Sequence, residues 1–298
     1  MLKTNIAGIE FKNPVIAASG TFGFGREFSK YIDLSRLGGI ASKGVTLKEK
    51  PGNSGIRVWE TPSGLMNSIG LQNPSVATFI EKDLDYMLGL GTEVLINLGG
   101  NTLEDYVEGA KLIENTDAKI IELNISCPNI EEGGKSFGMV CNDAVTVLRA
   151  VKEVSTKKIF VKLTPNSGEL VDVAVACERE GADAISMVNT FNALAIDIYR
   201  RKPVFNNITA GLSGPAIKPI ALRMVRDVAK AVNIPIIGMG GICDYKDAIE
   251  FIMAGATAVE VGTYNFVNTH AMIDIIEGME EFMKEQKISS LEEIRGII

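Results

Sequence analysis

A cysteine lies in the middle of residues 124–129, Asn-Ile-Ser-Cys-Pro-Asn, directly after the largely apolar run 119–123. The run is typical of a strand, so Cys127 is expected in the turn at the carboxyl end of that strand. A thiol can transfer a proton or attack a carbon atom, and a carboxamide such as Asn124 both donates and accepts hydrogen bonds. The segment therefore predicts a reactive thiol beside a planar, amide-rich ligand.

Short β-rich runs alternate with longer amphipathic runs along the chain, which is typical of repeated βα units on a parallel sheet. The run 169–180 has helical spacing and places Cys177 on its apolar face. Asp244 is the predicted N-cap of a helix over 245–254. The expected strands are 15–18, 39–42, 94–98, 120–123, 159–163, 184–188, 235–239 and 258–261.

These units favour an α/β fold, a closed (β/α)8 TIM barrel that forms one domain over residues 1–298. A small hairpin is expected at 4–11, and loop insertions are expected at the carboxyl face. A doubly wound open sheet is the alternative, but the glycines of 20–25 lack the GxGxxG spacing of its dinucleotide fingerprint.

The active site of such a barrel forms at the carboxyl ends of its strands. Each expected strand is followed by small, amide or cationic residues, which packing alone does not require. We therefore expect one site where these ends meet. Its candidate residues are Ser19, Lys43, Gly44, Asn97, Asn124, Cys127, Lys162, Asn189, Thr190, Gly240, Gly241, Gly262 and Thr263.

The glycines after the last two expected strands let backbone N–H groups approach a phosphate closely. Gly214, in the run 211–215 before another expected helix, adds a further loop of backbone donors. Tight βα turns are the alternative explanation for each glycine taken singly. Together the three loops predict a cofactor that carries a phosphate.

Lys43 and Lys162 each follow an apolar strand, where a solvated lysine is not expected. A desolvated cation needs an anionic partner, and a reduced flavin provides one. The alternative is a lysine whose ammonium group extends to solvent at the mouth of the barrel.

A long segment punctuated by glycine and proline, 61–74, separates the second and third expected strands. Loops of this length are usually functional, and Asn67 and the backbone here can bind a small heterocycle. A plain surface loop is the alternative, although it leaves Ile69 and Leu71 without a role. His270 is the only histidine and falls in the last helical region, so a histidine base is not expected.

Net charge is −7, which argues against a broad surface for nucleic acid or anionic membranes. No apolar run is long enough for a membrane span, and the first residues lack the layout of a signal peptide. The four cysteines include no CxxC pair, so neither an iron–sulfur cluster nor a zinc site is expected from this chain. We therefore expect a cytoplasmic enzyme that binds no metal ion.

Several motifs together resemble the dihydroorotate dehydrogenase family over nearly the whole chain. They are Ser-Lys-Gly at 42–44, Pro-Ser-Gly-Leu-Met-Asn-Ser-Ile-Gly-Leu-Gln-Asn at 62–73, Asn-Ile-Ser-Cys-Pro-Asn at 124–129, Val-Lys-Leu-Thr-Pro at 161–165, Gly-Leu-Ser-Gly-Pro-Ala-Ile-Lys-Pro at 211–219 and Gly-Met-Gly-Gly-Ile at 238–242. The resemblance implies a barrel that binds FMN and oxidises dihydroorotate to orotate in pyrimidine synthesis.

Cysteine rather than serine at position 127 resembles the soluble class of the family, and the segments 60–64 and 69–74 resemble its NAD-linked subtype. That subtype implies a partner subunit with FAD and a [2Fe-2S] cluster, in an assembly with two copies of each subunit. Cys127 would take the C5 proton while hydride passes from C6 to flavin N5, and residues 131–138 would form a lid.

The resemblance also implies the roles of individual residues. Cys127 and Lys162 are the implied catalytic residues. The implied FMN-binding residues are Ser19, Lys43, Gly44, Asn97, Asn124, Lys162, Val188, Gly214, Gly240, Gly241, Gly262 and Thr263. The implied substrate-binding residues are Lys43, Asn67, Ser68, Ile69, Gly70, Leu71, Asn124, Asn189 and Thr190.

Other functions remain open on the sequence. A related flavin barrel, either a fumarate-linked dihydroorotate oxidase or a dihydropyrimidine dehydrogenase, is one alternative. A sugar-phosphate isomerase or aldolase without flavin is a second, and a barrel kept only as a structural or binding subunit is a third.

Overall fold

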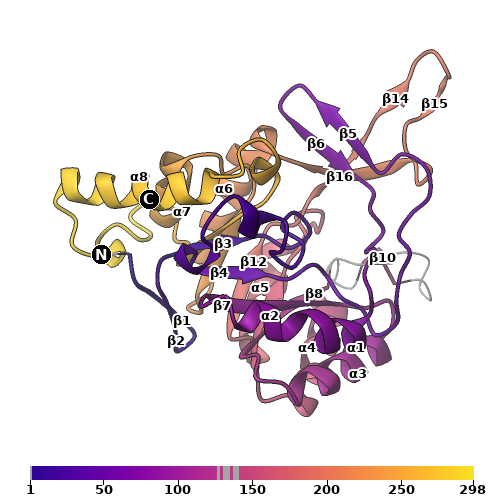
Figure 1. The fold of residues 1–298 in the computed structure, drawn as a ribbon, viewed down its shortest axis with the longest axis horizontal. Helices are drawn as coiled ribbons and strands as arrows, with labels where there is room; N and C mark the ends of the chain where they lie inside the picture. The colour runs from indigo at the N-terminus through magenta and orange to yellow at the C-terminus, as the bar shows by residue number, and fades with distance from the viewer. Residues whose placement is uncertain (1, 126–127, 130–134, 137–140) are drawn as a thin grey trace.

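The computed structural model describes residues 2–125, 128–129, 135–136 and 141–298. Eight parallel strands close into a barrel in chain order, which confirms the predicted (β/α)8 fold (Figure 1). Each lies within a residue or two of its expected position. The barrel strands are β3 (Val15–Ala17), β4 (Gly39–Ala41), β7 (Glu93–Gly99), β8 (Ile120–Asn124), β11 (Lys158–Lys162), β12 (Ala184–Met187), β17 (Ile236–Met239) and β18 (Ala258–Val261).

Helices pack on the outer face of the barrel and bury its outward apolar side chains. The α-helices are α1 (Val76–Phe79), α2 (Asp85–Leu88), α3 (Leu103–Glu114), α4 (Cys141–Val154), α5 (Leu170–Arg179), α6 (Lys218–Ala229), α7 (Tyr245–Met253) and α8 (Ala271–Gln286), and the π-helical turn η3 (Ile80–Leu84) joins α1 to α2. Short 3-10 turns are η1 (Phe28–Lys30), η2 (Leu34–Arg36), η5 (Pro215–Ile217), η6 (Thr263–Phe266) and η7 (Leu291–Glu293).

Local sequence explains where two of these helices begin and how they pack. Asp244 caps α7, and its side chain accepts hydrogen bonds from the backbone N–H groups of Lys246 and Asp247, as predicted. In α5, Cys177 lies on the buried apolar stripe. No helix in the described part of the chain is long and apolar enough to cross a membrane.

The amino end of the barrel is closed by the predicted hairpin, β1 (Thr4–Ile6) and β2 (Ile9–Phe11). Ile6 and Phe11 of the hairpin pack on an apolar layer inside the barrel to which each strand contributes one side chain. That layer consists of Ile16, Ala41, Leu95, Ile120, Phe160, Ala184, Ile237 and Ala258. Access to the interior is therefore left to the carboxyl end.

A second, antiparallel sheet projects from the carboxyl end of the barrel (Figure 1, upper right). Its strand order is β13 (Phe191–Leu194), β16 (Thr209–Ser213), β6 (Gly64–Asn67) and β5 (Val58–Thr61). The hairpin of β14 (Ile196–Asp197) and β15 (Lys202–Pro203) extends it, and β9 (Pro128–Asn129) pairs with β10 (Lys135–Ser136) elsewhere. We call β5, β6 and β13 to β16 the arm.

The sequence prediction treated 61–74 as a loop, and this was wrong for its first part. Strand β6 pairs with β16, so two insertions far apart in the chain form one sheet. A small apolar cluster of Met66, Val204, Phe205 and Ala210 holds the arm together.

Candidate active site

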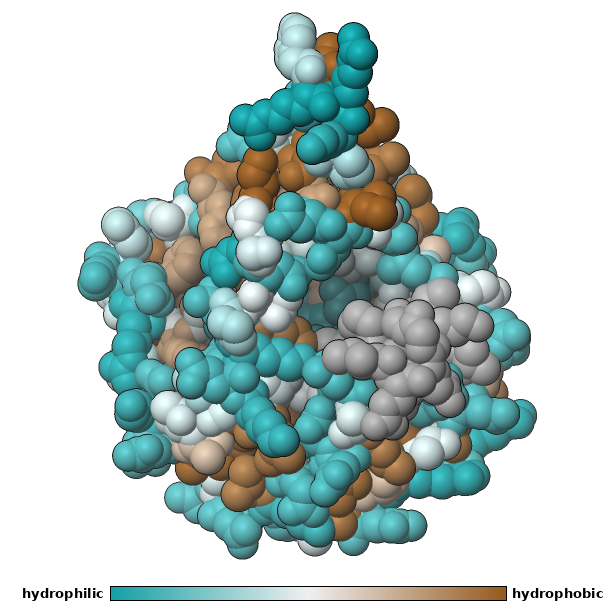
Figure 2. All heavy atoms as spheres, turned by 90° about the vertical axis from the view of Figure 1, so that its right-hand side faces the viewer, coloured by the Kyte–Doolittle hydropathy of each residue, from teal (hydrophilic) through white to brown (hydrophobic). Residues whose placement is uncertain are grey.

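A cavity of about 800 Å³ opens at the carboxyl ends of the barrel strands and below the arm. Figure 2 shows it as a hollow under the apolar side chains of the arm. The site residues predicted from the sequence that fall in the described ranges all line this one cavity. They are Ser19, Lys43, Gly44, Asn67, Ser68, Ile69, Gly70, Leu71, Asn97, Asn124, Lys162, Val188, Asn189, Thr190, Gly214, Gly240, Gly241, Gly262 and Thr263.

Cys127 lies outside the described residues, as do 131–134 and 137–138 of the predicted lid. The predicted position of this base therefore stays a prediction. Asn124 ends β8 and lines the cavity, with 7% of its surface exposed.

One part of the cavity is built from three glycine-containing loops. Gly240 and Gly241 follow β17, Gly262 follows β18, and Gly214 precedes η5. Gly241 has a φ of +78°, and a Cβ atom there would lie 2.8 Å from the carbonyl oxygen of Gly214. The two loops approach each other this closely because position 241 lacks a side chain, which leaves peptide groups at the cavity wall.

A second part of the cavity is rich in carboxamides. Asn189 accepts a hydrogen bond from the backbone N–H of Thr190 at 2.8 Å. Asn67, at the end of β6, donates to the carbonyl oxygen of Gly211 at 3.4 Å. These contacts orient amides on the barrel and on the arm toward the same space.

The loop after β6 is fixed by a buried asparagine. The Asn73 amide donates to the carbonyl oxygen of Leu71 at 2.6 Å, and its Oδ1 accepts from the backbone N–H groups of Thr46 and Ser75 at 3.1 and 2.9 Å. The backbone of residues 68–71 is thereby held at the cavity wall.

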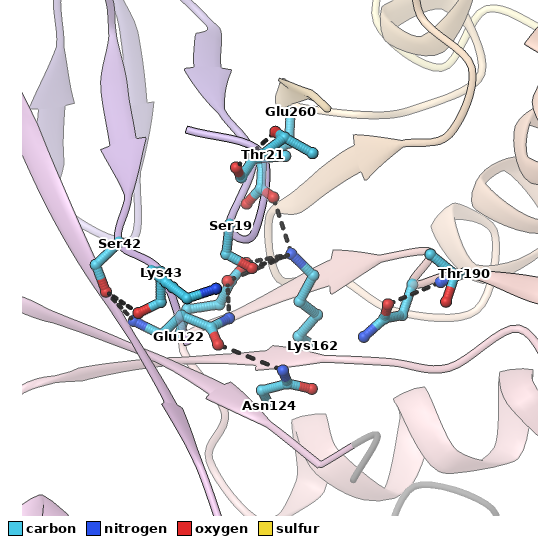
Figure 3. A network of polar contacts seen from close by, with 12 residues as sticks. Ser19, Thr21, Ser42, Lys43, Glu122, Asn124, Lys162, Thr190 and Glu260 are labelled. Atoms are coloured by element: carbon cyan, nitrogen blue, oxygen red, sulfur yellow. Dashed lines mark hydrogen bonds and ion pairs between the residues drawn. The ribbon is translucent and has the colours of Figure 1, made fainter. Parts of the chain in front are cut away.

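Lys162 lies on the floor of the cavity in contact with two glutamates (Figure 3). Its Nζ lies 3.0 Å from Oε2 of Glu260 on β18 and 3.4 Å from both carboxylate oxygens of Glu122 on β8. Nζ also lies 3.4 Å from the hydroxyl of Ser19. The Asn97 amide donates to Oε2 of Glu122, which links β7 to the cluster.

Burial and charge act against each other in this cluster. Burial alone would lower the pKa of Lys162, but the negative charges of Glu122 and Glu260 outweigh burial and raise it. Burial would raise the pKa of Glu122, but the positive charge of Lys162 and the hydrogen bond from Asn97 help to leave it lowered. Burial and the charge of Glu122 raise the pKa of Glu260 well above its ordinary value, despite Lys162.

This arrangement corrects one step of the sequence argument. Lys162 was expected to need a ligand as its anionic partner, and this was wrong because the barrel itself supplies Glu122 and Glu260. Lys43 fits the expectation better. Lys43 is half-buried, and burial and the charge of Arg57 lower its pKa. Unlike Lys162, it has no carboxylate within ion-pair distance in the described ranges.

Glu122 and Glu260 were missed by the sequence prediction. Each was assigned to a strand interior, two residues before a predicted site residue, Asn124 or Gly262. Since side chains alternate along a strand, a charge at that spacing faces the same way as the site residue. A glutamate within an otherwise apolar strand was the available signal.

Two of the other described cysteines, Cys177 and Cys243, give no second candidate base. Burial raises the pKa of Cys177 to about 12, in keeping with its place in the core. Cys243 lines the cavity, where burial and the charges of Asp247 and Asp244 raise its pKa to about 11. Within the described ranges, no group of three histidine, cysteine or acidic side chains is arranged to hold a metal ion.

The fold and the site together define a class: a (β/α)8 barrel with glycine loops after its last two strands, an amide-rich wall and a buried lysine on its floor. Phosphate sites in such barrels are commonly built from the loops after strands seven and eight.

Comparison with known proteins identifies the family. The family model described as dihydroorotate dehydrogenase matches residues 1–283, so the chain belongs to the dihydroorotate dehydrogenase family. It is 58% identical to the dihydroorotate dehydrogenase B (NAD(+)) catalytic subunit of Petrotoga mobilis, over 99% of both chains. The catalytic subunits of the same name from Alkaliphilus metalliredigens and Porphyromonas gingivalis are 51% and 48% identical, each over 99% of this chain and 98% of theirs.

Proposed function

We propose that this chain is the FMN-binding catalytic subunit of an NAD-linked dihydroorotate dehydrogenase, which oxidises (S)-dihydroorotate to orotate in pyrimidine biosynthesis. The observation that carries the proposal is the single cavity, which combines glycine loops, an amide-rich wall and the buried lysine. The names of relatives that match nearly the whole chain support the same activity.

The residues present fit FMN. The cavity volume, about 800 Å³, lies in the range of cofactor sites. Gly214 and Gly241 line the cavity and pack so closely on neighbouring backbone that neither position has room for a Cβ atom. The wall there consists of peptide groups, and such a surface suits a phosphate. The remaining FMN-binding roles are proposed for Ser19, Lys43, Gly44, Asn97, Asn124, Lys162, Val188, Gly240, Gly262 and Thr263. FMN, when bound, supplies the hydride acceptor.

The carboxamides are proposed to bind the substrate ring. Dihydroorotate is a cyclic ureide with a carboxylate, so it presents N–H donors and carbonyl acceptors on its edges. Asn67, Asn124 and Asn189 offer both kinds of group. Thr190 and the backbone at 68–71 complete the proposed contacts, and Lys43 offers its charge to the carboxylate.

Cys127 is proposed as the general base, which accepts the C5 proton of the substrate at its Sγ atom. An unperturbed thiol has a pKa of about 8.5, so the thiolate fraction and the rate are expected to rise toward alkaline pH. The segment 131–138 is proposed to exclude water during the reaction.

Electron transfer is proposed to use a second subunit, since the relatives are named as catalytic subunits of an NAD(+) enzyme. The proposed partner carries FAD and a [2Fe-2S] cluster, and two copies of each subunit assemble in the cytoplasm. The same names do not favour a fumarate-linked oxidase or a dihydropyrimidine dehydrogenase.

The test is spectroscopic. The chain, purified and reconstituted with FMN, should show a flavin spectrum that dihydroorotate bleaches. Cys127→Ala should retain FMN and bind orotate but lose most dihydroorotate oxidation. A protein that stays colourless after reconstitution would contradict the FMN proposal, and near-normal turnover of Cys127→Ala would contradict only the role of Cys127.

A further inference from the structure

Two carboxyl groups and one amine are buried together under the cavity. Glu122 is 0%, Glu260 1% and Lys162 4% exposed. Glu122 and Lys162 are the charged groups that act on Glu260. The further polar side chains that act on Glu122, Asn97 and Ser186, are neutral. If both carboxyls were ionised, the cluster would hold an uncompensated negative charge away from solvent, which is strongly unfavourable.

Hydrogen bonding at Glu260 gives a second, independent indication. Its Oε2 contacts the amine of Lys162, but Oε1 is buried and receives no hydrogen bond from any donor in the described part of the chain. The neighbouring polar group is a second carboxyl, that of Glu122, which as a carboxylate can only accept. An acceptor without a donor, next to another acceptor, is the arrangement that one added proton satisfies.

We propose that Glu122 and Glu260 share one proton at neutral pH, carried mainly by Glu260. The two glutamates act as positioning residues that keep the Lys162 ammonium group charged and fixed on the cavity floor. With the shared proton, the ammonium group and the single carboxylate balance, and the cluster is neutral. The opposite pKa shifts of the two carboxyls agree with this assignment.

The shared proton stands on the geometry of this chain, and its consequence for catalysis rests on the proposed function. Glu260 lines the cavity proposed to hold FMN. Loss of the proton at high pH would add a negative charge beside a cofactor that itself gains negative charge on reduction. The neutral cluster therefore favours reduction, and its ionisation opposes it.

The proton is directly measurable by infrared difference spectroscopy of the purified chain, with or without FMN. A protonated carboxyl gives an infrared band of its own, separate from the bands of carboxylates. The wild-type protein at neutral pH should show an acid band that Glu260→Gln removes. Glu122→Gln should remove the same band, because the remaining Glu260 then ionises as the counter-ion of Lys162.

Glu10→Gln is the matched control, since Glu10 forms an exposed ion pair with Lys3 on the hairpin at the far end of the barrel. It should leave the acid band unchanged. The proposal is overturned if neither glutamine variant removes an acid band from the wild-type spectrum. An acid band that persists in Glu122→Gln would contradict the sharing of the proton. If Glu260→Gln does not fold, the presence or absence of the band in Glu122→Gln alone tests the proposal.

The reduction potential of bound FMN tests the consequence separately. Glutamine mimics a protonated glutamate, so Glu260→Gln should match the wild-type potential at neutral pH. Toward alkaline pH, the wild-type potential should fall more steeply than that of the variant. A large upward shift in the variant at neutral pH would show that Glu260 is ionised. Identical profiles at every pH, together with the expected infrared result, would leave the shared proton in place and contradict its effect on the cofactor.

Discussion

At the scale of single residues, the unusual feature of this molecule is a charged cluster directly above an apolar layer of the barrel. Lys162, Glu122 and Glu260 replace the apolar side chains that fill the layer below them. A buried ion pair adds little net stability, because desolvation offsets most of the attraction. The cluster is therefore better explained by the chemistry of the cavity above it than by folding.

Glu260→Gln should change how stability depends on pH. The folded-state pKa of Glu260 is raised above its ordinary value of 4.5, so the folded protein binds more protons than the unfolded chain between these two values. Stability that this group contributes is full below the ordinary pKa and is lost as pH rises through the raised one. The variant lacks that loss. Its free energy of unfolding, relative to that of the wild type, should therefore increase by about 1.4 kcal/mol per pH unit between the ordinary and the raised pKa.

The measurement is urea unfolding at a series of pH values, from about pH 5 to about pH 8. Glu10→Gln serves again as the control and should follow the wild-type profile. A difference between Glu260→Gln and wild type that stays constant with pH would contradict a raised pKa for Glu260.

At the scale of elements, the site depends on loops that approach one another without side chains. Gly241→Ala places a Cβ atom 2.8 Å from the Gly214 carbonyl oxygen, on a backbone with φ of +78°. We expect the two loops to move apart and the dissociation constant of FMN to rise at least tenfold, which corresponds to about 1.4 kcal/mol. Fluorescence titration of the apoprotein with FMN measures it.

Gly8→Ala separates backbone strain from crowding. Gly8 has a φ of +89° in the hairpin, but a Cβ there meets no atom within 4 Å. It should lower stability slightly and leave FMN affinity unchanged. Equal losses of FMN affinity in the two variants would argue against loop contact as the cause.

The site also depends on the arm, because the arm carries Asn67 and the loop 68–71 on a small apolar core. Phe205, 2% exposed, belongs to the cluster of four buried residues that holds the arm. Phe205→Ala removes packing of the kind that costs about 3–5 kcal/mol in a core, which a cluster this small cannot replace. We expect faster hydrogen exchange over 191–213 and a KM for dihydroorotate raised roughly tenfold, with FMN content unchanged.

Ile198→Ala is the control for the arm, since Ile198 lies in the same insertion with 71% of its surface exposed. It should leave KM and exchange unchanged. A Phe205→Ala variant that loses FMN in proportion to its rise in KM would indicate that the barrel, not the arm, had been disturbed.

At the scale of the whole molecule, the two ends of the barrel differ. The hairpin closes the amino end with apolar side chains, whereas the cavity opens at the carboxyl end under the arm. Electrons that leave the proposed cofactor must pass near this open end, so we expect the partner subunit to bind there.

The isolated chain with FMN should oxidise dihydroorotate with an artificial electron acceptor but reduce no NAD+. Addition of the electron-transfer subunit should restore NAD+ reduction, because the proposed FAD and [2Fe-2S] groups reside on it. Absorbance assays of NADH formation with and without the partner make the comparison. Rapid NAD+ reduction by this chain alone would refute the proposed division of labour.

Much of this molecule could be predicted because its signals are local. Each barrel strand was located from a short apolar run, and α7 from its capping residue Asp244. The strand-end residues converge on one cavity because closure of a parallel barrel brings all carboxyl ends together. The arm was missed because its pairing of β6 with β16 joins segments about one half of the chain apart, and each strand is too short to be recognised alone.

The sequence by itself therefore determined the fold, the family resemblance and the residues at the strand ends. Tertiary structure alone decided which charged side chains meet inside the barrel. Lys162 is separated from Glu122 by 40 residues and from Glu260 by 98, yet all three lie in contact on the barrel floor. The physical reason is that alternation along a strand fixes which way a side chain points, while closure of the barrel fixes what it faces.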